Sequence, residues 1–286
     1  MFAMDLVQAR AEYAENLRRL GEIRTSALVR AFATVPREEF VGLGPWKILF
    51  PNALRAGYRT TDDAHPRHLY QNVHIALDEN RRLNNGEPLA LARWLDALEL
   101  KAGDRVLHIG CGVGYYTAII AEAVTPNGAV VGVEFDAPLA ATARDKLARY
   151  ANVKVVCEDG SSFDAGPMDV IFVNAGTTHP QSIWLDRLRP QGRLLVPLTV
   201  EIAGHSAGAG HMLKVTHAEC GFTARFVSPV CIFHCAGART DEANERLRRA
   251  YEAGDLDTVR ELRREPHSQA KSCWLHTSGF CLSTGA

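Results

Sequence analysis

The most constraining feature of this 286-residue sequence is a regular alternation of helical and strand-like segments that begins at about residue 89. Apolar residues recur at helical spacing over residues 88–100, 115–124, 137–150 and 180–188. Short apolar runs typical of buried strands lie between them, at residues 104–110, 129–135, 153–159, 168–175 and 192–198. This order predicts an α/β fold with a doubly wound, mostly parallel sheet, in which ligands bind at the carboxyl ends of the strands.

The segments on either side follow other patterns. Residues 5–34 have the apolar spacing of a helix, which Pro36 ends. Residues 42–88 are rich in Gly, Pro, Asn and His, which predicts long loops with short strands. Loops of that length usually serve a site.

A change of composition after Ala238 predicts a short helical hairpin over residues 240–265, with Gly254 as the stop and Asp255 as the next cap. We therefore expect three parts. These are residues 1–88, a helical and loop region that contributes to a substrate site; 89–237, a cofactor-binding domain; and 238–286, a C-terminal helical extension.

Composition excludes several classes of protein. The formal net charge is −1, so the chain lacks the basic character that nucleic-acid binding usually requires, and we expect no nucleic-acid partner. No apolar run is long enough to span a membrane, and the acidic N-terminal segment does not resemble a secretory signal. Seven scattered cysteines fit free thiols in a reducing compartment. The expected location is cytoplasmic.

A glycine-rich turn follows the strand at 104–110. Gly110, Gly112 and Gly114 form a G-x-G-x-G pattern, whereas the dinucleotide fingerprint is G-x-G-x-x-G, whose third glycine would fall on Tyr115. The spacing therefore argues against a nicotinamide cofactor. Glycine backbone still lets a ligand lie close to the chain.

Two further strand ends point to an adenosine. Glu134 ends the next strand and suits ribose hydroxyl groups, and Asp159 with Gly160 ends a third strand and could accept from an adenine amino group. Each feature alone is also typical of an ordinary turn or a solvated strand end. Their order on three successive strands favours a nucleoside pocket, and S-adenosylmethionine is the natural ligand because it lacks a pyrophosphate. The predicted cofactor-binding residues are His108, Gly110, Cys111, Gly112, Gly114, Tyr115, Glu134, Phe135, Asp159, Gly160 and Asn174.

With these motifs the chain resembles the protein-L-isoaspartate O-methyltransferase family, within the class I S-adenosylmethionine-dependent methyltransferases, from about residue 28 to 237. LVRAFATVPREEFV is similar to the family's N-terminal helix and VPRE.FV signature, and YQNVHIAL occupies the place of its Y.D.PLPI segment. LELKAGDRVLHIGCGVGYYTA, NVKVVCEDG, MDVIFVNAG, LRPQGRLLVPL and GFTARFVSPVCIF follow in the family's order. The resemblance implies a Rossmann-like fold and methyl transfer.

Two departures from the family pattern concern the site. The family usually has an acidic residue where this chain has His108, which could bind the cofactor or be a packed strand residue; its position favours the first. The family's I-S-x-P segment carries a serine near the reacting carboxylate, but here Asn84, Asn85, Gly86 and Glu87 precede Pro88. The missing serine puts repair of damaged aspartyl sites in doubt, but not methyl transfer.

The expected acceptor is a carboxylate of a peptide, a protein or a small metabolite. Such a group, with a pKa of about 4, is ionised at neutral pH and needs orientation rather than a base. Asn84 and Asn85 could aim the acceptor, and Arg81 or Arg82 could hold it, although a polar surface loop is the plain alternative.

A hydroxyl or amine acceptor would instead need a base. The candidates are His74, Glu87 and His179, of which His179, after the fourth strand, is best placed. The predicted catalytic residues are Asn84, Asn85, Glu87 and His179. Two other functions remain open: a small-molecule O- or N-methyltransferase that uses such a base, and a cofactor-binding module without catalysis. A nucleic-acid adenine methyltransferase would need an N-P-P-Y/F type segment, and NAGT at 174–177 is not one.

Cysteines and histidines near the C-terminus raise the question of zinc. Cys231, His234 and Cys235, with Cys273 and His276 farther on, do not have the spacing of the usual Cys-x-x-Cys knuckle, so no metal site is predicted. The tail CWLHTSGFCLS (273–283) is expected to dock on the core as an apolar segment. Two roles are expected to be possible for this tail: it could cover the active site, or it could form an oligomer contact, such as the interface of a homodimer.

Overall fold

The structure, a computed structural model, describes residues 2–52, 57–277 and 279–284. The chain forms two compact units. The first comprises the described residues up to 103 together with 111–130 and 136–156; the second comprises 104–110, 131–135 and the described residues from 157 onward. This division follows spatial contacts and interleaves the sequence, so the three-part division at 88 and 237 stays a prediction.

Two helices begin the first unit, α1 (Phe2–Gly21) and α2 (Ser26–Thr34). The single helix predicted over 5–34 is therefore interrupted, and Glu22 has a φ of 55° at the break. The backbone N–H groups of Arg24 and Thr25 donate to Asp96 Oδ1 at 3.0 and 2.8 Å. Because Asp96 is far along the chain, local periodicity could not reveal this break. The predicted end before Pro36 is confirmed, since Val35 caps α2.

Long loops and short strands follow, as predicted. They include η1 (Arg37–Phe40), β1 (Lys47–Leu49), β2 (Arg59–Thr60), η3 (Pro66–Leu69), β3 (His74–Asp78) and β4 (Leu83–Asn84). The strands form a small sheet in the order β2-β1-β3-β4, with Ile48 opposite Ile75. Both isoleucines belong to a buried cluster with Trp46, Leu69 and Val73. This core supports the hairpin of β3 and β4, which carries Asn84.

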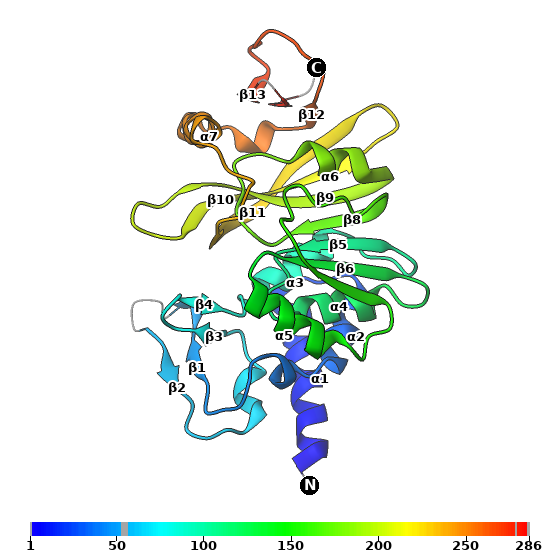
Figure 1. Ribbon diagram of the computed structural model, residues 1–286, viewed down its shortest axis with the longest axis vertical. Coiled ribbons are helices and arrows are strands. Elements are labelled where there is room, and N and C mark those ends of the chain that lie inside the picture. Colours follow the sequence, from blue (N-terminus) through cyan, green and yellow to red (C-terminus); the bar gives the residue numbers. More distant parts are fainter. Residues whose placement is uncertain (1, 53–56, 278, 285–286) are drawn as a thin grey trace. The chain divides into compact units, whose positions relative to one another are not determined.

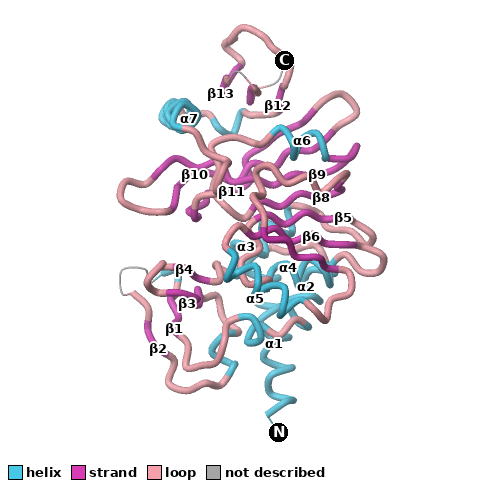
Figure 2. The backbone as a smooth tube through the Cα atoms, viewed as in Figure 1, coloured by secondary structure: helices cyan, strands magenta, loops and turns pink. Residues whose placement is uncertain are grey.

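The alternating region forms the elements that its periodicity predicts. They are α3 (Pro88–Ala97), β5 (Arg105–Ile109), α4 (Tyr115–Ala123), β6 (Ala129–Glu134), α5 (Ala137–Leu147), β7 (Val153–Cys157), β8 (Met168–Val173), α6 (Ser182–Arg187) and β9 (Leu188–Glu201). β8 pairs in parallel with both β5 and β9. The predicted α/β class with a mostly parallel central sheet is confirmed (Figures 1 and 2).

The sheet becomes antiparallel beyond β9. β10 (Ala207–His217) pairs antiparallel with β9 and with β11 (Phe222–Phe233). The full strand order is β13-β14-β12-β11-β10-β9-β8-β5-β6-β7. None of the helices in the described part of the chain is both long and apolar enough to cross a membrane.

The C-terminal extension contains one of the two predicted helices. Its elements are α7 (Asp241–Ala253), η4 (Leu256–Thr258), β12 (Glu261–Arg263), β13 (Cys273–His276) and β14 (Cys281–Ser283). Gly254, with a φ of 80°, ends α7 as predicted. The second predicted helix is wrong, because Leu262 pairs with Phe222 of β11 and the segment becomes a strand. Asp255 makes no side-chain cap.

A fully buried cation organises the first unit. The Arg37 guanidinium donates to the carbonyl oxygens of Leu69, Gln71 and Val73 at 2.7, 3.2 and 2.8 Å. These bonds fix the chain just before β3. A buried donor with several acceptors is expensive to remove, because each acceptor then loses its partner.

We expect Arg37→Met to lower the free energy of unfolding by about 3 kcal/mol, since three buried carbonyl groups lose a charged donor. Urea denaturation measures the change. Arg24→Met is the matched control, because that side chain is 84% exposed, and it should shift stability by no more than about 0.5 kcal/mol. Equal stability of the two variants would refute the role assigned to Arg37.

Candidate active site

The carboxyl end of β5 is held by the strands on both sides of it, within the second unit. The Gly110 N–H donates to Val133 O at 2.8 Å, and the Asn174 N–H donates to Ile109 O at 2.8 Å. Asn174 Nδ2 also donates to Gly110 O at 3.4 Å. The backbone at the start of the glycine turn is therefore fixed from two directions.

The three glycines of the turn have different surroundings. A Cβ added at Gly110 would lie 3.1 Å from Asn174 O, and one added at Gly114 would lie 2.7 Å from Leu147 Cδ1. Both positions also have a positive φ, of 73° and 95°, so the backbone conformation itself favours glycine at them. At Gly112, with a φ of 56°, an added Cβ would meet no atom within 4 Å. Gly112 is the glycine that leaves open space in which a ligand can approach the backbone.

Acidic residues stand at the ends of two further strands. Glu134, the last residue of β6, is buried, and Asp159 follows β7 with its Oδ1 accepting from the Ser161 N–H at 2.8 Å. A Cβ at Gly160 would lie 2.4 Å from Ile109 Cγ2, so only glycine fits against the end of β5. The predicted order of a glycine and two acids on successive strand ends is present in the second unit.

The loop after β11 lies beside these acids, which sequence reasoning missed. A Cβ at Gly237 would lie 2.5 Å from Asp159 Oδ2. Burial, followed by the negative charges of Asp159 and Glu134, raises the pKa of the Cys235 thiol to about 12. The next residues are also anchored, since Arg239 donates to Gly176 O at 3.2 Å and to Thr199 Oγ1 at 2.9 Å. The glycine at position 237 is the sequence feature that indicates this close approach of the loop to Asp159.

His108 is fully buried on β5. Its ring stacks on Phe172 of β8 with 5.0 Å between centroids and 19° between planes. Burial lowers the pKa of His108 to about 3, so the ring is neutral at pH 7. The stacking supports the packed-strand alternative, and a bond to the cofactor stays a prediction.

The other predicted cofactor residues differ in exposure. Cys111 and Tyr115 are buried, whereas Phe135 is 64% exposed. An exposed aromatic beside Glu134 is available for stacking. The individual contacts of these residues with a cofactor stay predictions.

The predicted acceptor segment lies in the first unit and forms a tight turn. Asn84 Oδ1 accepts from the Gly86 N–H at 2.9 Å, and the Asn85 N–H donates to Ile75 O at 2.9 Å. The Asn85 side chain is buried, and its Nδ2 has no hydrogen-bond partner among the described residues. A buried amide without a partner is unusual and calls for an explanation such as a ligand.

The turn has a glycine at the serine position of the family pattern. Counted back from Pro88, the serine of I-S-x-P falls on Gly86, which has a φ of 73°. A Cβ there would lie 3.2 Å from Leu91 Cδ2. This backbone conformation favours glycine, so the residue types at 84–86 act as a set.

Two charged residues beside this turn, Glu87 and Arg81, already have side-chain partners. Glu87 Oε1 accepts from Asn72 Nδ2 at 2.9 Å, and Asn72 Oδ1 accepts from the Leu89 N–H at 2.9 Å. Arg81 pairs with Asp136 at 2.5 Å from Nη2 to Oδ2. Arg82 is exposed, with a φ of 55°. Glu87 is thus held in the framework, and Arg81 is paired within the first unit.

His74, another predicted base, lies on β3 of the first unit. Burial lowers its pKa and outweighs the opposite effect of Glu87. The ring is therefore neutral at pH 7.

His179, the other candidate base, belongs to the second unit. Its Nδ1 lies 3.0 Å from Thr178 Oγ1, and its Nε2 lies 3.2 Å from Gln181 Nε2. The Gln181 amide nitrogen can only donate, so His179 Nε2 accepts from it and the ring proton lies on Nδ1. Burial lowers the pKa of His179. The ring is neutral, but its lone pair already accepts a hydrogen bond.

The cysteines and histidines considered as zinc ligands in the sequence do not form one cluster. In the part of the chain that the structure describes, the group of possible metal ligands comprises His267, Cys273, His276 and Cys281. Cys231, His234 and Cys235 are not part of it.

Known proteins match both the sequence and the fold. The family described as protein-L-isoaspartate(D-aspartate) O-methyltransferase matches residues 8–207. The protein-L-isoaspartate O-methyltransferase of Methanopyrus kandleri is 32% identical over 196 residues, which cover 67% of this chain and 77% of that protein.

Two solved structures share the fold. One is a protein-L-isoaspartate O-methyltransferase with a TM-score of 0.63 and 23% identity, covering 89% of this chain and 72% of its own. The other is a putative protein-L-isoaspartate O-methyltransferase from Plasmodium falciparum in complex with S-adenosyl-L-homocysteine. It has a TM-score of 0.59 and 19% identity, and covers 79% of this chain and 97% of its own.

The chain belongs to the protein-L-isoaspartate(D-aspartate) O-methyltransferase family. It is accordingly an S-adenosylmethionine-dependent methyltransferase, and the predicted family, enzyme class and cofactor are confirmed.

We expect Glu134→Gln to weaken binding of S-adenosylmethionine about 10- to 100-fold, because charge-assisted hydrogen bonds contribute about 1.5–3 kcal/mol. Isothermal titration calorimetry measures the dissociation constant. Glu158→Gln, at an exposed carboxylate on the neighbouring strand end, is the control and should leave binding within about twofold. Unchanged affinity of Glu134→Gln would exclude a ribose contact.

Proposed function

We propose that this methyltransferase acts on a carboxylate oxygen of a peptide, a protein or a small metabolite. The observation that carries the proposal is the buried, unpartnered amide of Asn85, in the segment where related enzymes carry a serine. An amide N–H is a donor, and a carboxylate offers two acceptor oxygens. Asn85 therefore has the chemistry to orient an acceptor.

The cofactor fits the residues at the strand ends. Within the second unit, Glu134 offers acceptors for ribose hydroxyl groups, and Asp159 offers one for an amino group. S-adenosylmethionine supplies an electrophilic methyl group when bound. The protein's part is to hold the two reactants in line and to exclude water.

The state of the candidate bases supports an acceptor that needs no proton removal. A carboxylate with a pKa of about 4 is already ionised at neutral pH. The His179 lone pair accepts from Gln181, and Glu87 accepts from Asn72, so both groups have other partners. A hydroxyl or amine acceptor would need a base in addition, and a carboxylate acceptor does not.

The identity of the acceptor is the finer part of the proposal. Relatives are named for protein L-isoaspartate, whereas this chain has glycine at the serine position of the family pattern. We propose that an amide donor replaces the serine hydroxyl and that the acceptor differs from an isoaspartyl residue accordingly. Cytoplasmic location, a homodimer and the lack of a nucleic-acid partner also stay predictions.

The proposal is tested by incubating the enzyme with methyl-labelled S-adenosylmethionine and an acceptor panel. The panel pairs isoaspartyl with aspartyl peptides and adds small carboxylic acids. We expect label that mild alkali releases as methanol, because methyl esters hydrolyse readily, with no preference for the isoaspartyl peptide. Alkali-stable label would establish another nucleophile, and a strong isoaspartyl preference would contradict the proposed change of acceptor.

Within the same assay, Asn85→Ala should lower kcat/KM for the acceptor about 10- to 100-fold, because the carboxylate loses a donor worth about 1.5–3 kcal/mol. Affinity for the cofactor should not change. Asn80→Ala, at an exposed position of the preceding turn, is the matched control. If both variants retain parental kcat/KM, Asn85 does not contact the acceptor.

A further inference from the structure

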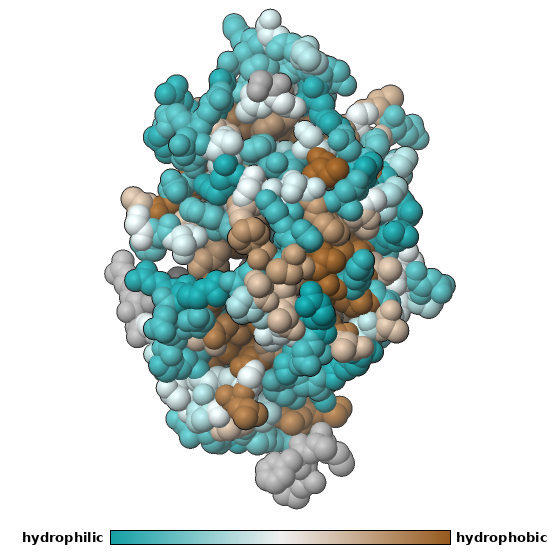
Figure 3. Space-filling model, viewed as in Figure 1, coloured by the Kyte–Doolittle hydropathy of each residue, from teal (hydrophilic) through white to brown (hydrophobic). Residues whose placement is uncertain are grey.

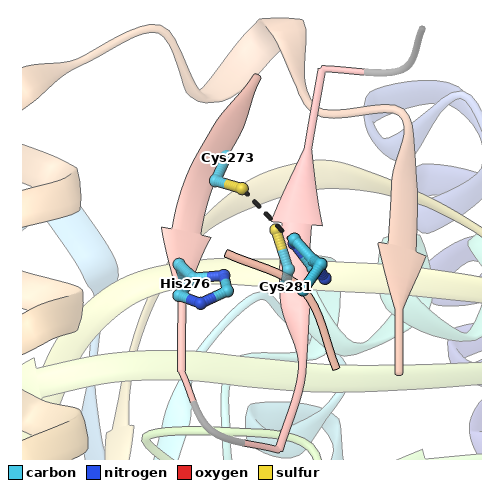
Figure 4. A group of neighbouring side chains, drawn as sticks. Cys273, His276 and Cys281 are labelled. Atoms are coloured by element: carbon cyan, nitrogen blue, oxygen red, sulfur yellow. Dashed lines mark hydrogen bonds between the residues drawn. The ribbon is translucent and has the colours of Figure 1, made fainter. Parts of the chain in front are cut away.

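We propose that His267, Cys273, His276 and Cys281 form a structural zinc site in the C-terminal extension. Each residue offers one ligand atom, and these atoms all lie within 4.8 Å of one another. Figure 4 shows Cys273, His276 and Cys281 gathered around one space from β13 and β14. The proposal replaces the expectation of no metal, which considered Cys273 and His276 together with Cys231, His234 and Cys235 but not His267 or Cys281.

The distances suit a tetrahedral ion. His267 Nε2 lies 3.5 Å from Cys273 Sγ. With Zn–N and Zn–S bonds of about 2.1 and 2.3 Å, the nitrogen–sulfur edge of a tetrahedron is about 3.6 Å and the sulfur–sulfur edge about 3.8 Å. The nitrogen–nitrogen edge is about 3.4 Å, so even the widest ligand pair would move together by no more than about 1.4 Å when an ion binds.

Hydrogen bonds around the cluster orient the ligand atoms. His267 Nδ1 lies 2.8 Å from Glu265 O, so the ring donates there and its Nε2 is left as the ligand. The Ala270 N–H donates to Cys273 Sγ at 3.3 Å, which stabilises a thiolate. His276 Nδ1 is buried and has no hydrogen-bond partner among the described residues. An ion would satisfy that nitrogen.

The strand register argues against a simple disulfide. Cys281 is opposite His276, whereas Cys273 is opposite Ser283. The two cysteines are therefore not direct cross-strand partners, and two imidazole rings stand with them, 4.8 Å apart between the centroids of His267 and His276. Two thiolates and two neutral imidazoles are a common ligand set for zinc and balance its charge.

Four protein ligands leave no open position, which is typical of a structural site rather than a catalytic one. The ion would join residues 264–272, through His267, to β13 and β14. Residues 264–272 contain no large apolar side chain. On the face shown in Figure 3, the surface around β12, β13 and α7, at the top of the view, is mostly hydrophilic. Zinc would supply the cross-link that a hydrophobic core supplies elsewhere.

The test uses the full chain, purified with reductant, and measures metal content by mass spectrometry after zinc loading and gel filtration. We expect about one zinc per chain. Cobalt substitution should then produce the visible band of tetrahedral Co²⁺ and a thiolate-to-cobalt charge-transfer band. Chelation should speed proteolysis within residues 264–277, because the fastening is lost.

Variants separate the site from adventitious binding. Cys273→Ser and His276→Gln should weaken metal binding by about 100-fold or more. His276→Cys should keep the metal and strengthen the charge-transfer band, which a merely structural histidine would not do. Cys231→Ser, at an exposed cysteine outside the cluster, is the control and should bind as the parent does.

Three results would overturn the proposal: no stoichiometric zinc or cobalt in the reduced parent, equal metal loss in Cys231→Ser, or a Cys273–Cys281 disulfide in protein kept under reductant. Because the parent protein itself is assayed, a variant that fails to fold leaves the question decidable. None of these readouts depends on methyl transfer, so they are independent of the proposed acceptor.

Discussion

The site depends on one constraint, the fixing of the backbone where β5 ends. The hydrogen bonds from Gly110 to Val133 and from Asn174 to Ile109 connect that point to both neighbouring strands. Gly160 packs against Ile109 so closely that a single methyl group would clash. A turn held in this way does not need to reorganise when a ligand arrives, which lowers the entropic cost of binding.

In the acceptor segment, too, the backbone around the functional side chain is fixed by its neighbours. A glycine with positive φ at position 86 and an Asn84 side chain that caps the turn leave Asn85 buried with an unused donor. A hydroxyl could not simply be restored at Gly86 without strain in the turn.

Local patterns were sufficient for much of this molecule. The alternating strands and helices, the glycine turn and the strand-end acids Glu134 and Asp159 follow from periodicity and spacing alone, and the structure has them in that order. Features that depend on contacts between residues far apart in the sequence could not be predicted from local patterns. The break at Glu22 depends on Asp96, and residues 261–263 form a strand because β11 offers them an edge. The cluster around Cys273 arises only when β13 and β14 align.

The anchored residues after β11 bear on how far this enzyme can be shortened. Arg239 binds Gly176 and Thr199, and the Thr178 N–H donates to Ala238 O at 3.2 Å. A chain cut at 237, the end of the predicted cofactor-binding domain, would lack Ala238 and Arg239, which anchor the loop that lies against Asp159. Attempts to graft or trim this enzyme should therefore keep residues 238 and 239 attached.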